Sequence, residues 1–368
     1  MARIGIATAF FQQYRAGTWF YTLNLLRAID ALPEAEGRFF TVDFLNQPIA
    51  ELRRIGHLTL PFPDLKLAKV IWPNTVLPAG ASRNGLDLVH APTHYGTFVP
   101  GRCRNVITIH DVTPLLYPET HGRMQVYYHR FILPRVLDRA DAVITISECS
   151  KRDILRCYGI AESKLHVVYN GVDARFAPGL SRDSDFTKSL PARYILNIGT
   201  LEARKNLPRL IEAFALARKK GLTHPLVIGG VKGWRMSQLA NIVEQCGVSQ
   251  AVHFLGYVDD ADIPALYANA EFFVYPSLYE GFGLPVLEAM GCGTPVITSN
   301  VSSLPEVAGD AALLIDPRDV QDLAEKLLQM AGCAELRATL AEKGLAQAAR
   351  FSWEKTARET LQVYERLL

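Results

Sequence analysis

Two glutamates eight positions apart, Glu280 and Glu288, flank a short segment that contains two glycines. The apolar run 272–275 predicts a buried strand before this segment, and Pro285 suits the first turn of a helix after it. Amide groups at a helix start attract anions, whereas carboxylates accept hydrogen bonds from hydroxyls. A ligand with both phosphate and vicinal hydroxyls fits this pairing. The alternative is an ordinary helix start with acidic residues, and the two-glycine turn favours the ligand site.

Two adjacent cations, Arg204 and Lys205, follow the predicted strand 194–199 and stand where a helix is expected to begin. Positive charge at a helix start opposes the helix dipole, so we interpret the pair as the partner of an anion. The planar fork of arginine and the point charge of lysine together suit a diphosphate. The alternative is a solvated pair balanced by Glu202.

Two further residues follow predicted strands. His110 ends the strand expected at 106–110, where its imidazole can exchange a hydrogen bond with a sugar hydroxyl. Gly17 follows the first strand and lets the backbone approach a ligand closely. A satisfied structural histidine and a simple helix cap are the corresponding alternatives.

We expect no metal site. Two Asp-x-Asp pairs, Asp183 with Asp185 and Asp260 with Asp262, lie in an expected linker and before an expected helix. Neither pair closely follows a buried strand, as a site that holds a cation with nucleotide phosphates would. The chain also lacks a Walker loop, a Gly-x-Ser-x-Gly turn and a Gly-x-Gly-x-x-Gly fingerprint, which argues against a nicotinamide dehydrogenase.

Composition narrows the class of protein. With 368 residues, 49% of them hydrophobic, the chain is long enough for two cores. A net charge of only +2 gives no support for nucleic-acid binding. The six cysteines form no Cys-x-x-Cys pair, and no apolar run reaches the ~18 residues that a membrane span needs. The opening apolar stretch is interpreted as a strand rather than an export signal, so we expect a cytoplasmic protein.

Short apolar runs alternate with segments of helical period along most of the chain, which predicts an α/β protein with two doubly wound parallel sheets. The expected division is a first domain over 1–175, a linker over 176–191, a second domain over 192–350, and a C-terminal helix over 351–368 that packs back across the linker. The site is expected where the two halves face each other, beyond the carboxyl ends of the strands. The expected strands are 4–7, 39–44, 86–90, 106–110, 142–146, 165–169, 194–199, 226–229, 252–254, 272–275, 295–298 and 312–315.

Taken together, these segments resemble the retaining glycosyltransferases of family four, which have the GT-B architecture. The segment from Glu280 to Glu288 matches the family's Glu-x7-Glu motif. Supporting elements are His110, the run 199–206 and the run 170–173. The resemblance implies two Rossmann-like domains that face each other across a cleft.

The resemblance also implies a role for each residue. Glu288 would hold the ribose of a nucleotide sugar, and Arg204 and Lys205 would neutralise its diphosphate in place of a metal. His110 would contact the sugar near the reacting carbon. One departure concerns the first loop, where Ala16 stands in place of the first of two glycines found in many members. The implied catalytic residues are His110, Arg204, Lys205 and Glu280, and the implied donor-binding residues are Gly17, Gly199, Tyr257, Val258, Phe282, Gly283, Leu284 and Glu288.

The run 199–206 and the phrase at 110–119 are similar to those of bacterial mannosyltransferases of O-antigen and exopolysaccharide assembly. They imply GDP-mannose as donor, no cofactor, and a glycan or lipid-linked oligosaccharide as acceptor. A UDP- or dTDP-linked donor, a GT-B sugar-nucleotide epimerase and a non-catalytic assembly partner remain the alternatives. The segment 121–139 combines aromatic residues with arginines, which fits either contact with anionic lipid or an ordinary amphipathic helix.

Overall fold

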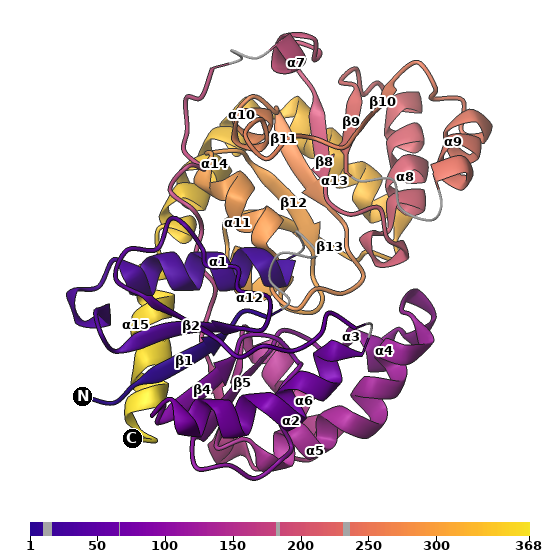
Figure 1. Ribbon diagram of the computed structural model, residues 1–368. Coiled ribbons are helices and arrows are strands. Elements are labelled where there is room, and N and C mark those ends of the chain that lie inside the picture. Colours follow the sequence, from indigo (N-terminus) through magenta and orange to yellow (C-terminus); the bar gives the residue numbers. More distant parts are fainter. Residues whose placement is uncertain (10–16, 66, 182–184, 231–235) are drawn as a thin grey trace. The chain divides into compact units, whose positions relative to one another are not determined.

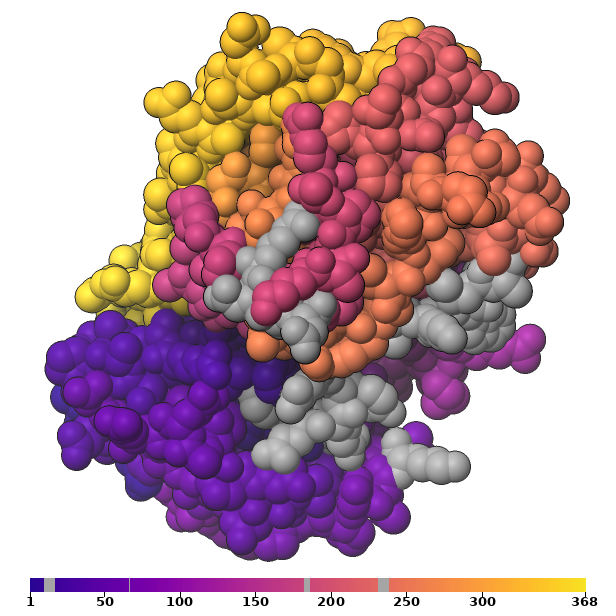
Figure 2. Space-filling model, turned by 90° about the horizontal axis from the view of Figure 1, so that it is seen from above, coloured from indigo at the N-terminus to yellow at the C-terminus, as the bar shows by residue number. Residues whose placement is uncertain are grey.

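The computed structural model describes residues 1–9, 17–65, 67–181, 185–230 and 236–368, and the remaining residues are drawn in grey in Figures 1 and 2. Ala16 and Asp183 lie outside the described residues. The chain forms two compact units, one of residues 1–171 with 352–368 and the other of residues 172–351.

The first unit contains a seven-stranded parallel sheet in the order β3-β2-β1-β4-β5-β6-β7. Strand β1 lies between β2 and β4. The chain runs from β1 outward through β2 and β3 and then returns to β4 on the other side of β1. The pair β1 and β4 is therefore the topological switch point, where open α/β sheets bind ligands. Strand β3 was not expected, because its residues are all only partly buried and form no apolar run. The strands are β1 (Ile4–Ala7), β2 (Phe39–Asp43), β3 (Gly56–Thr59), β4 (Leu88–Ala91), β5 (Arg104–Ile109), β6 (Ala142–Thr145) and β7 (Leu165–Val167).

Helices cover this sheet, and local sequence signals explain where several of them begin and end. In the helix after β6, the Ser147 hydroxyl accepts a hydrogen bond from the Ser150 amide, and Gly159 ends the helix with φ of 62°. The helices of the first unit are α1 (Gly17–Asp30), α2 (Ala68–Arg83), α3 (Thr113–Leu116), α4 (Arg123–Tyr127), the π-helical turn η3 (Tyr128–Ile132), α5 (Leu133–Arg139), α6 (Glu148–Tyr158) and α15 (Trp353–Glu365), with short 3₁₀ turns η1 (Pro33–Ala35), η2 (Pro118–Thr120) and η4 (Glu162–Lys164).

The C-terminal helix α15 belongs to the first unit and lies beside α1 (Figure 1). The backbone passes so closely that a Cβ at Gly171 would stand 2.1 Å from the amide nitrogen of Trp353. Further along α15, Tyr364 is fully buried and its hydroxyl lies 2.6 Å from Nδ1 of His90 on β4. The last helix therefore completes the first core.

The second unit contains a six-stranded parallel sheet in the order β10-β9-β8-β11-β12-β13, with its switch point between β8 and β11. The prediction of two doubly wound parallel sheets is thus confirmed. The strands are β8 (Ile195–Ile198), β9 (Leu226–Gly229), β10 (Val252–Gly256), β11 (Phe272–Tyr275), β12 (Val296–Ser299) and β13 (Ala312–Ile315). The helices are α7 (Asp185–Lys188), the 3₁₀ turn η5 (Ala203–Lys205), α8 (Leu207–Lys219), α9 (Met236–Gln245), α10 (Ile263–Ala268), α11 (Leu284–Gly291), α12 (Leu304–Ala308), α13 (Val320–Gly332) and α14 (Ala334–Ala348).

The units divide the chain at residues 171/172 and 351/352, whereas the sequence placed the divisions at 175 and 350. The segment 176–191, expected to be a linker, falls within the second unit, although residues 182–184 are not described. Within the described ranges, no helix combines the length and the apolar character needed to cross a bilayer.

Candidate functional site

Glu280, Arg204 and Lys205 form one ion-paired cluster in the second unit. Lys205 Nζ lies 2.6 Å from one carboxylate oxygen of Glu280, and a guanidinium nitrogen of Arg204 lies 2.6 Å from the other. Glu280 and Lys205 are each only 7% exposed. The sequence indicated cations that face an anion, and in the structure this anion is Glu280, with Glu202 as a second partner of Arg204 at 2.9 Å. The cluster is therefore neither a solvated pair nor balanced by Glu202 alone.

The buried carboxylate of the cluster is ionised at neutral pH. Burial by itself would raise the pKa of Glu280, but the charges of Lys205 and Arg204 hold that pKa at about 2. Burial also lowers the pKa of Lys205, against the attraction of Glu280. The Lys205 amino group in addition donates to the hydroxyl of Tyr275. Two cations thus share one buried carboxylate, and the second carboxylate that pairs with Arg204, Glu202, is 44% exposed.

The positions of these three residues follow from the switch point between β8 and β11. The turn η5 follows β8 and carries the two cations, while the loop after β11 carries Glu280. The two loops are joined because the Leu278 amide donates to the Arg204 carbonyl at 2.7 Å. Asn206 ends η5 with φ of 62°, and its side-chain amide donates to the carbonyls of Pro276 and Pro317. An asparagine tolerates this left-handed conformation better than most residues.

Two serines that the sequence analysis missed hold the Glu280 loop. The Glu280 amide donates to the Ser302 hydroxyl at 3.1 Å, and the Ser303 hydroxyl donates to the Glu280 carbonyl at 2.9 Å. Ser302 has φ of 57°, an uncommon conformation outside glycine. In the sequence, these two serines indicate only that a helix begins nearby, and this helix is α12.

The glycine turn continues directly into α11. Gly283 has φ of 125°, and a Cβ at this position would stand 3.0 Å from a methyl carbon of Leu304. Leu284 begins α11 and Pro285 is in its first turn, as predicted. Phe282 is buried at 3% exposure. The turn thus places the first amides of α11 directly after the Glu280 loop.

Glu288 lies further along α11 in a different environment. Its carboxylate accepts a hydrogen bond from the hydroxyl of Tyr267 at 3.2 Å. Burial raises the pKa of Glu288 to about 7, although Tyr267 and Arg175 act in the opposite direction. The negative charges of Asp260 and Asp173, which both pair with Arg175, act with burial and also raise this pKa. Glu288 is therefore close to half-ionised at neutral pH.

The other predicted donor-binding residues of this unit lie in loops that are connected through their backbones. The Gly199 amide donates to the Gly229 carbonyl at 3.0 Å, and the Gly230 amide donates to the Gly256 carbonyl at 2.8 Å. After β10, the Tyr257 side chain is 62% exposed while Val258 is buried. These loops follow β8, β9 and β10, and so share the carboxyl edge of the sheet with the ion-paired cluster.

His110 and Gly17 belong to the first unit. His110 Nε2 lies 3.0 Å from the Pro92 carbonyl, which can only accept, so Nε2 carries the proton. Burial lowers the pKa of His110, so the ring is neutral at pH 7 and Nδ1 is an acceptor. Tyr21 of α1 packs edge-on against the ring, with centroids 4.7 Å apart. Gly17 is exposed at the first position of α1, and a Cβ added to it would meet no atom of the described residues within 4 Å.

Potential metal ligands are not grouped in the described part of the chain. No set of three or more histidine, cysteine or acidic side chains converges there. Of the Asp-x-Asp residues, Asp260 is engaged by Arg175, and Asp183 is among the residues not described.

Comparison with known proteins identifies the class of protein. Residues 17–176 match Glycosyltransferase Family 4, and residues 182–347 match Glycosyl transferases group 1. An O-antigen chain mannosyltransferase B from Escherichia coli is 38% identical over 92% of this chain and 88% of its own length. A serotype-specific mannosyltransferase from the same species is 32% identical over 72% of this chain, which spans only 34% of that longer protein. The chain therefore belongs to family 4 of the glycosyltransferases.

Solved structures agree on the fold. A sucrose-phosphate synthase from Thermosynechococcus elongatus superimposes with a TM-score of 0.80 at 22% identity, covering 100% of this chain and 99% of that one. Anabaena HepE, determined in complex with UDP and glucose, superimposes with a TM-score of 0.74 at 20% identity, covering 99% and 100% of the two chains. Both are related to this chain in fold.

Proposed function

We propose that the protein is a retaining mannosyltransferase that moves mannose from GDP-mannose to a glycan or a lipid-linked oligosaccharide. The observation that carries this proposal is the pair of cations Arg204 and Lys205, held by the buried carboxylate of Glu280 at the switch point of a Rossmann-type sheet. The names of the two Escherichia coli relatives support mannose as the sugar.

In the proposed reaction, the bond between the sugar C1 and the diphosphate oxygen breaks, and a bond from C1 to an acceptor oxygen forms on the same face. The leaving phosphate oxygen takes the proton of the acceptor hydroxyl. Negative charge grows on the diphosphate as the first bond breaks, so preorganised cations stabilise the transition state more than the bound donor. Arg204 and Lys205 supply this charge without a metal ion. Glu280 keeps both side chains in place, and its remaining lone pairs can accept from sugar hydroxyls.

The roles of His110 and Glu288 follow from their protonation. The Nε2–H group of His110 is bound to the Pro92 carbonyl, so the free lone pair of Nδ1 would accept a hydrogen bond from a hydroxyl of the transferred sugar. Glu288, in its ionised form, would accept hydrogen bonds from both ribose hydroxyls, and the first amides of α11 would donate to phosphate. Gly17, Gly199, Tyr257 and Val258 would complete the donor site.

Ligand-induced thermal stabilisation tests the donor. GDP should raise the midpoint of thermal unfolding in the presence of EDTA, and UDP and dTDP should raise it less at equal concentration. The variant Arg204→Ala should lose most of the GDP effect. A shift with UDP alone would overturn the mannose proposal, and equal shifts in the wild type and Arg204→Ala would remove the cluster from the donor site.

We also propose that the enzyme works at the inner face of the cytoplasmic membrane, through the helical segment 123–135. Met124, Tyr127 and Phe131 are 68%, 51% and 47% exposed, although all three are large and apolar. They alternate at helical spacing with exposed arginines, a pattern typical of helices that rest on anionic lipid. The exposed arginines are Arg123, Arg130 and Arg135.

Flotation with vesicles tests this surface. The wild type should float with vesicles that contain phosphatidylglycerol and remain below with pure phosphatidylcholine. The triple variant Met124→Ser, Tyr127→Ser, Phe131→Ser should not float, although its affinity for GDP is retained. Equal flotation of the triple variant and the wild type would show that this face does not contact lipid.

A further inference from the structure

Arg175 connects two loops of the second unit. It lies in the segment 172–176, where the chain enters this unit. Its two terminal guanidinium nitrogens donate to the two carboxylate oxygens of Asp260 at 2.7 and 2.9 Å, and one of them also donates to the Asp260 carbonyl at 3.0 Å. Asp260 belongs to the loop after β10, which also carries Tyr257 and Val258. Because a bidentate contact has a defined geometry, it fixes this loop against the segment of Arg175.

The same segment packs closely on α11, the helix that carries Glu288. A Cβ at Gly291 would stand 3.0 Å from the Phe176 carbonyl oxygen and 3.4 Å from a methyl carbon of Val172. Gly291 lies three positions after Glu288, and residues at this spacing are neighbours on the surface of a helix. The segment of Arg175 therefore crosses α11 one turn beyond the carboxylate.

A series of aromatic contacts leads from Arg175 to the same carboxylate. The guanidinium carbon lies 4.9 Å from the centroid of the Phe176 ring. The Phe176 ring packs edge-on against the Tyr267 ring, with centroids 5.9 Å apart. The Tyr267 hydroxyl in turn donates to Glu288 at 3.2 Å. Arg175 and Glu288 thus belong to one packed group of side chains.

One cation in this group is shared by two carboxylates. Besides its contact with Asp260, the Arg175 Nε lies 3.8 Å from a carboxylate oxygen of Asp173. The two aspartates disfavour the ionised form of Glu288, and Arg175 favours it. The ionisable groups that face Glu288 are Arg175 and Asp173 of the segment 172–176, Asp260 of the loop after β10, Tyr267 of α10 and Cys292 of α11.

The exposure of the ion pair argues against a role in folding. The side chains of Arg175 and Asp260 are 32% and 43% exposed, and ion pairs with this access to water contribute little to stability. An uncompensated charge, in contrast, still affects a carboxyl group that packs beside it. The place of the pair beside Glu288 is therefore its more informative property.

We propose that Arg175 is a positioning residue, which balances the charges of Asp173 and Asp260 so that Glu288 can accept hydrogen bonds as a carboxylate. In this assignment Arg175 contacts no substrate itself and acts through Glu288. The inference rests on the proposed function, because there the Glu288 carboxylate holds the ribose of the donor.

Carbon-13 NMR of side-chain carboxyl groups in the ligand-free full chain measures the titration of Glu288, whose signal is the one absent from Glu288→Gln. Arg175→Gln should raise the pKa of Glu288 by roughly half a pH unit or more, because the two aspartates lose their counter-charge. Asp260→Asn should lower it, because one opposing charge is removed. A purely structural contact would be broken in both variants, and both would then change the pKa in the same direction.

Two further variants complete the experiment. Arg175→Lys should titrate close to the wild type, because lysine keeps the charge although it loses the bidentate contact. Arg193→Gln is the matched control and should leave the titration of Glu288 unchanged. Arg193 makes a similar bidentate contact with Glu271, at 2.6 and 2.9 Å, but this pair lies before β8 and β11 at the opposite edge of the sheet.

The affinity for GDP links the titration to the donor. At pH 7 a rise of roughly half a pH unit lowers the ionised fraction of Glu288 from about one half to about one quarter, so Arg175→Gln should bind GDP at least about twofold more weakly than the wild type. The loss should be smaller at pH 8.5, where Glu288 is mostly ionised in both proteins. An equal loss at the two pH values would overturn the inference.

The remaining outcomes separate the inference from the proposed function. Opposite changes of the Glu288 pKa in Arg175→Gln and Asp260→Asn, together with no GDP binding by the wild type, would support the charge balance and overturn the proposed donor. GDP binding by the wild type, with a Glu288 pKa that changes in the same direction in both variants or in neither, would leave the proposed function intact and overturn the inference. Titration of Arg175→Lys like that of Arg175→Gln would also overturn it.

Discussion

Two glutamates of one motif have opposite acid–base behaviour because their neighbours differ. Glu280 faces the buried Lys205 and the partly buried Arg204, and their charges hold its pKa at about 2. Glu288 faces a tyrosine hydroxyl, and burial raises its pKa to about 7. The first glutamate is a permanent charge that organises other charges. The second can change its ionisation under physiological conditions.

Glu280→Gln should reduce stability most strongly near neutral pH. The pKa of Glu280 is lower in the folded protein than its ordinary value of 4.5, so its contribution is full above that value and is lost as pH falls toward about 2. A shift of this size corresponds to on the order of 3 kcal/mol. Urea unfolding measured between pH 2 and pH 7 should show that the free energy of unfolding of Glu280→Gln is lower than that of the wild type at pH 7. The difference should disappear in acid. Glu202→Gln is the control, because a half-exposed ion pair contributes about 1 kcal/mol or less. Equal effects of both variants would contradict the assignment of Glu280.

Glu288 should make donor binding depend on pH. With a folded pKa of about 7, roughly one tenth of the carboxyl groups are ionised at pH 6 and nine tenths at pH 8. Because the ionised form is the one proposed to accept from ribose, the affinity for GDP-mannose should rise about tenfold over this range. Calorimetric titration in EDTA at the two pH values measures it. A Glu288→Gln protein should bind weakly at both, and an unchanged pH dependence in that variant would place the titrating group elsewhere.

At the scale of elements, the C-terminal helix is part of the first core through a chain of buried polar groups. Burial lowers the pKa of His90 to about 3, so the ring is neutral. The Tyr364 hydroxyl then donates to Nδ1, and Nε2–H donates to the Thr108 hydroxyl at 2.8 Å. Thr108 also contacts the hydroxyl of Tyr21, whose ring packs against His110.

Tyr364→Phe should destabilise the first unit by about 1 to 3 kcal/mol, because it leaves a buried imidazole nitrogen without a donor. Urea unfolding measures the change. A double-mutant cycle with His90→Leu isolates the bond from general packing effects. If the two substitutions were additive, the hydroxyl and the imidazole would not be energetically coupled.

Gly171→Ala should also release α15. The added Cβ would stand 2.1 Å from the Trp353 backbone nitrogen, which cannot move without shifting the helix. Overpacking of this kind costs about 1 to 3 kcal/mol, so the midpoint of urea unfolding should fall and limited proteolysis should cleave before α15 sooner. Gly122→Ala should change neither property, because a Cβ at this position would meet no atom of the described residues within 4 Å. Similar proteolysis of both variants would contradict this close approach.

The sequence predicted most elements because buried parallel strands form uninterrupted apolar runs, as Phe272–Tyr275 does. It missed β3, an edge strand whose residues are only partly buried. It located Arg204, Lys205 and Glu280 individually but not their mutual pairing, since contacts between residues 75 apart depend on the order of strands. Ser302 and Ser303 were missed for the same reason, because a helix-start signal does not reveal which loop the hydroxyls contact.

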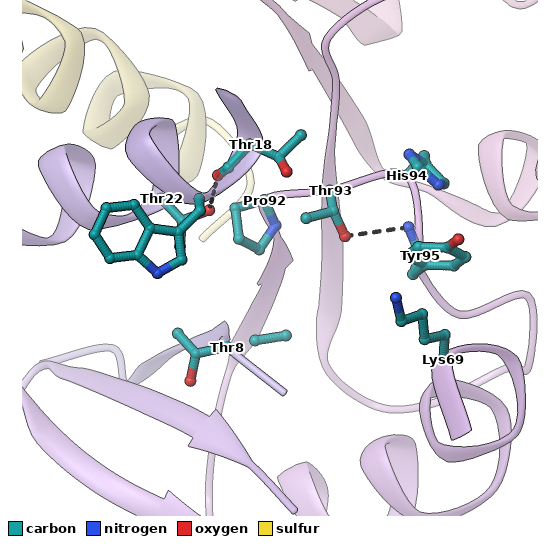
Figure 3. A pocket seen from close by; sticks show the side chains of 10 residues that line it. Thr8, Thr18, Thr22, Lys69, Pro92, Thr93, His94 and Tyr95 are labelled. Carbon is teal, nitrogen blue, oxygen red and sulfur yellow. Dashed lines mark hydrogen bonds between the residues drawn. The ribbon is translucent and has the colours of Figure 1, made fainter. Parts of the chain in front are cut away.

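At the scale of the molecule, the two units repeat one topological design. In each unit, the first strand in chain order lies between the second and the fourth strand of that unit. Each switch point carries polar side chains. In the second unit these side chains are charged. In the first unit they are mainly hydroxyl groups and aromatic rings, which line the pocket in Figure 3. Under the proposed function, we expect substitutions in the charged cluster of the second unit to weaken donor binding.

The most direct test measures transfer of labelled mannose from GDP-mannose to α-mannosides in EDTA, with the anomeric configuration of the product determined by NMR. The wild type should form an α-linked product without added metal. Arg204→Ala and Glu280→Gln should each lower kcat by at least a hundredfold, as expected from the loss of an electrostatic contact in the transition state, while circular dichroism remains native. A β-linked product, a strict requirement for a divalent metal, or unchanged kcat in the folded Arg204→Ala protein would contradict the account.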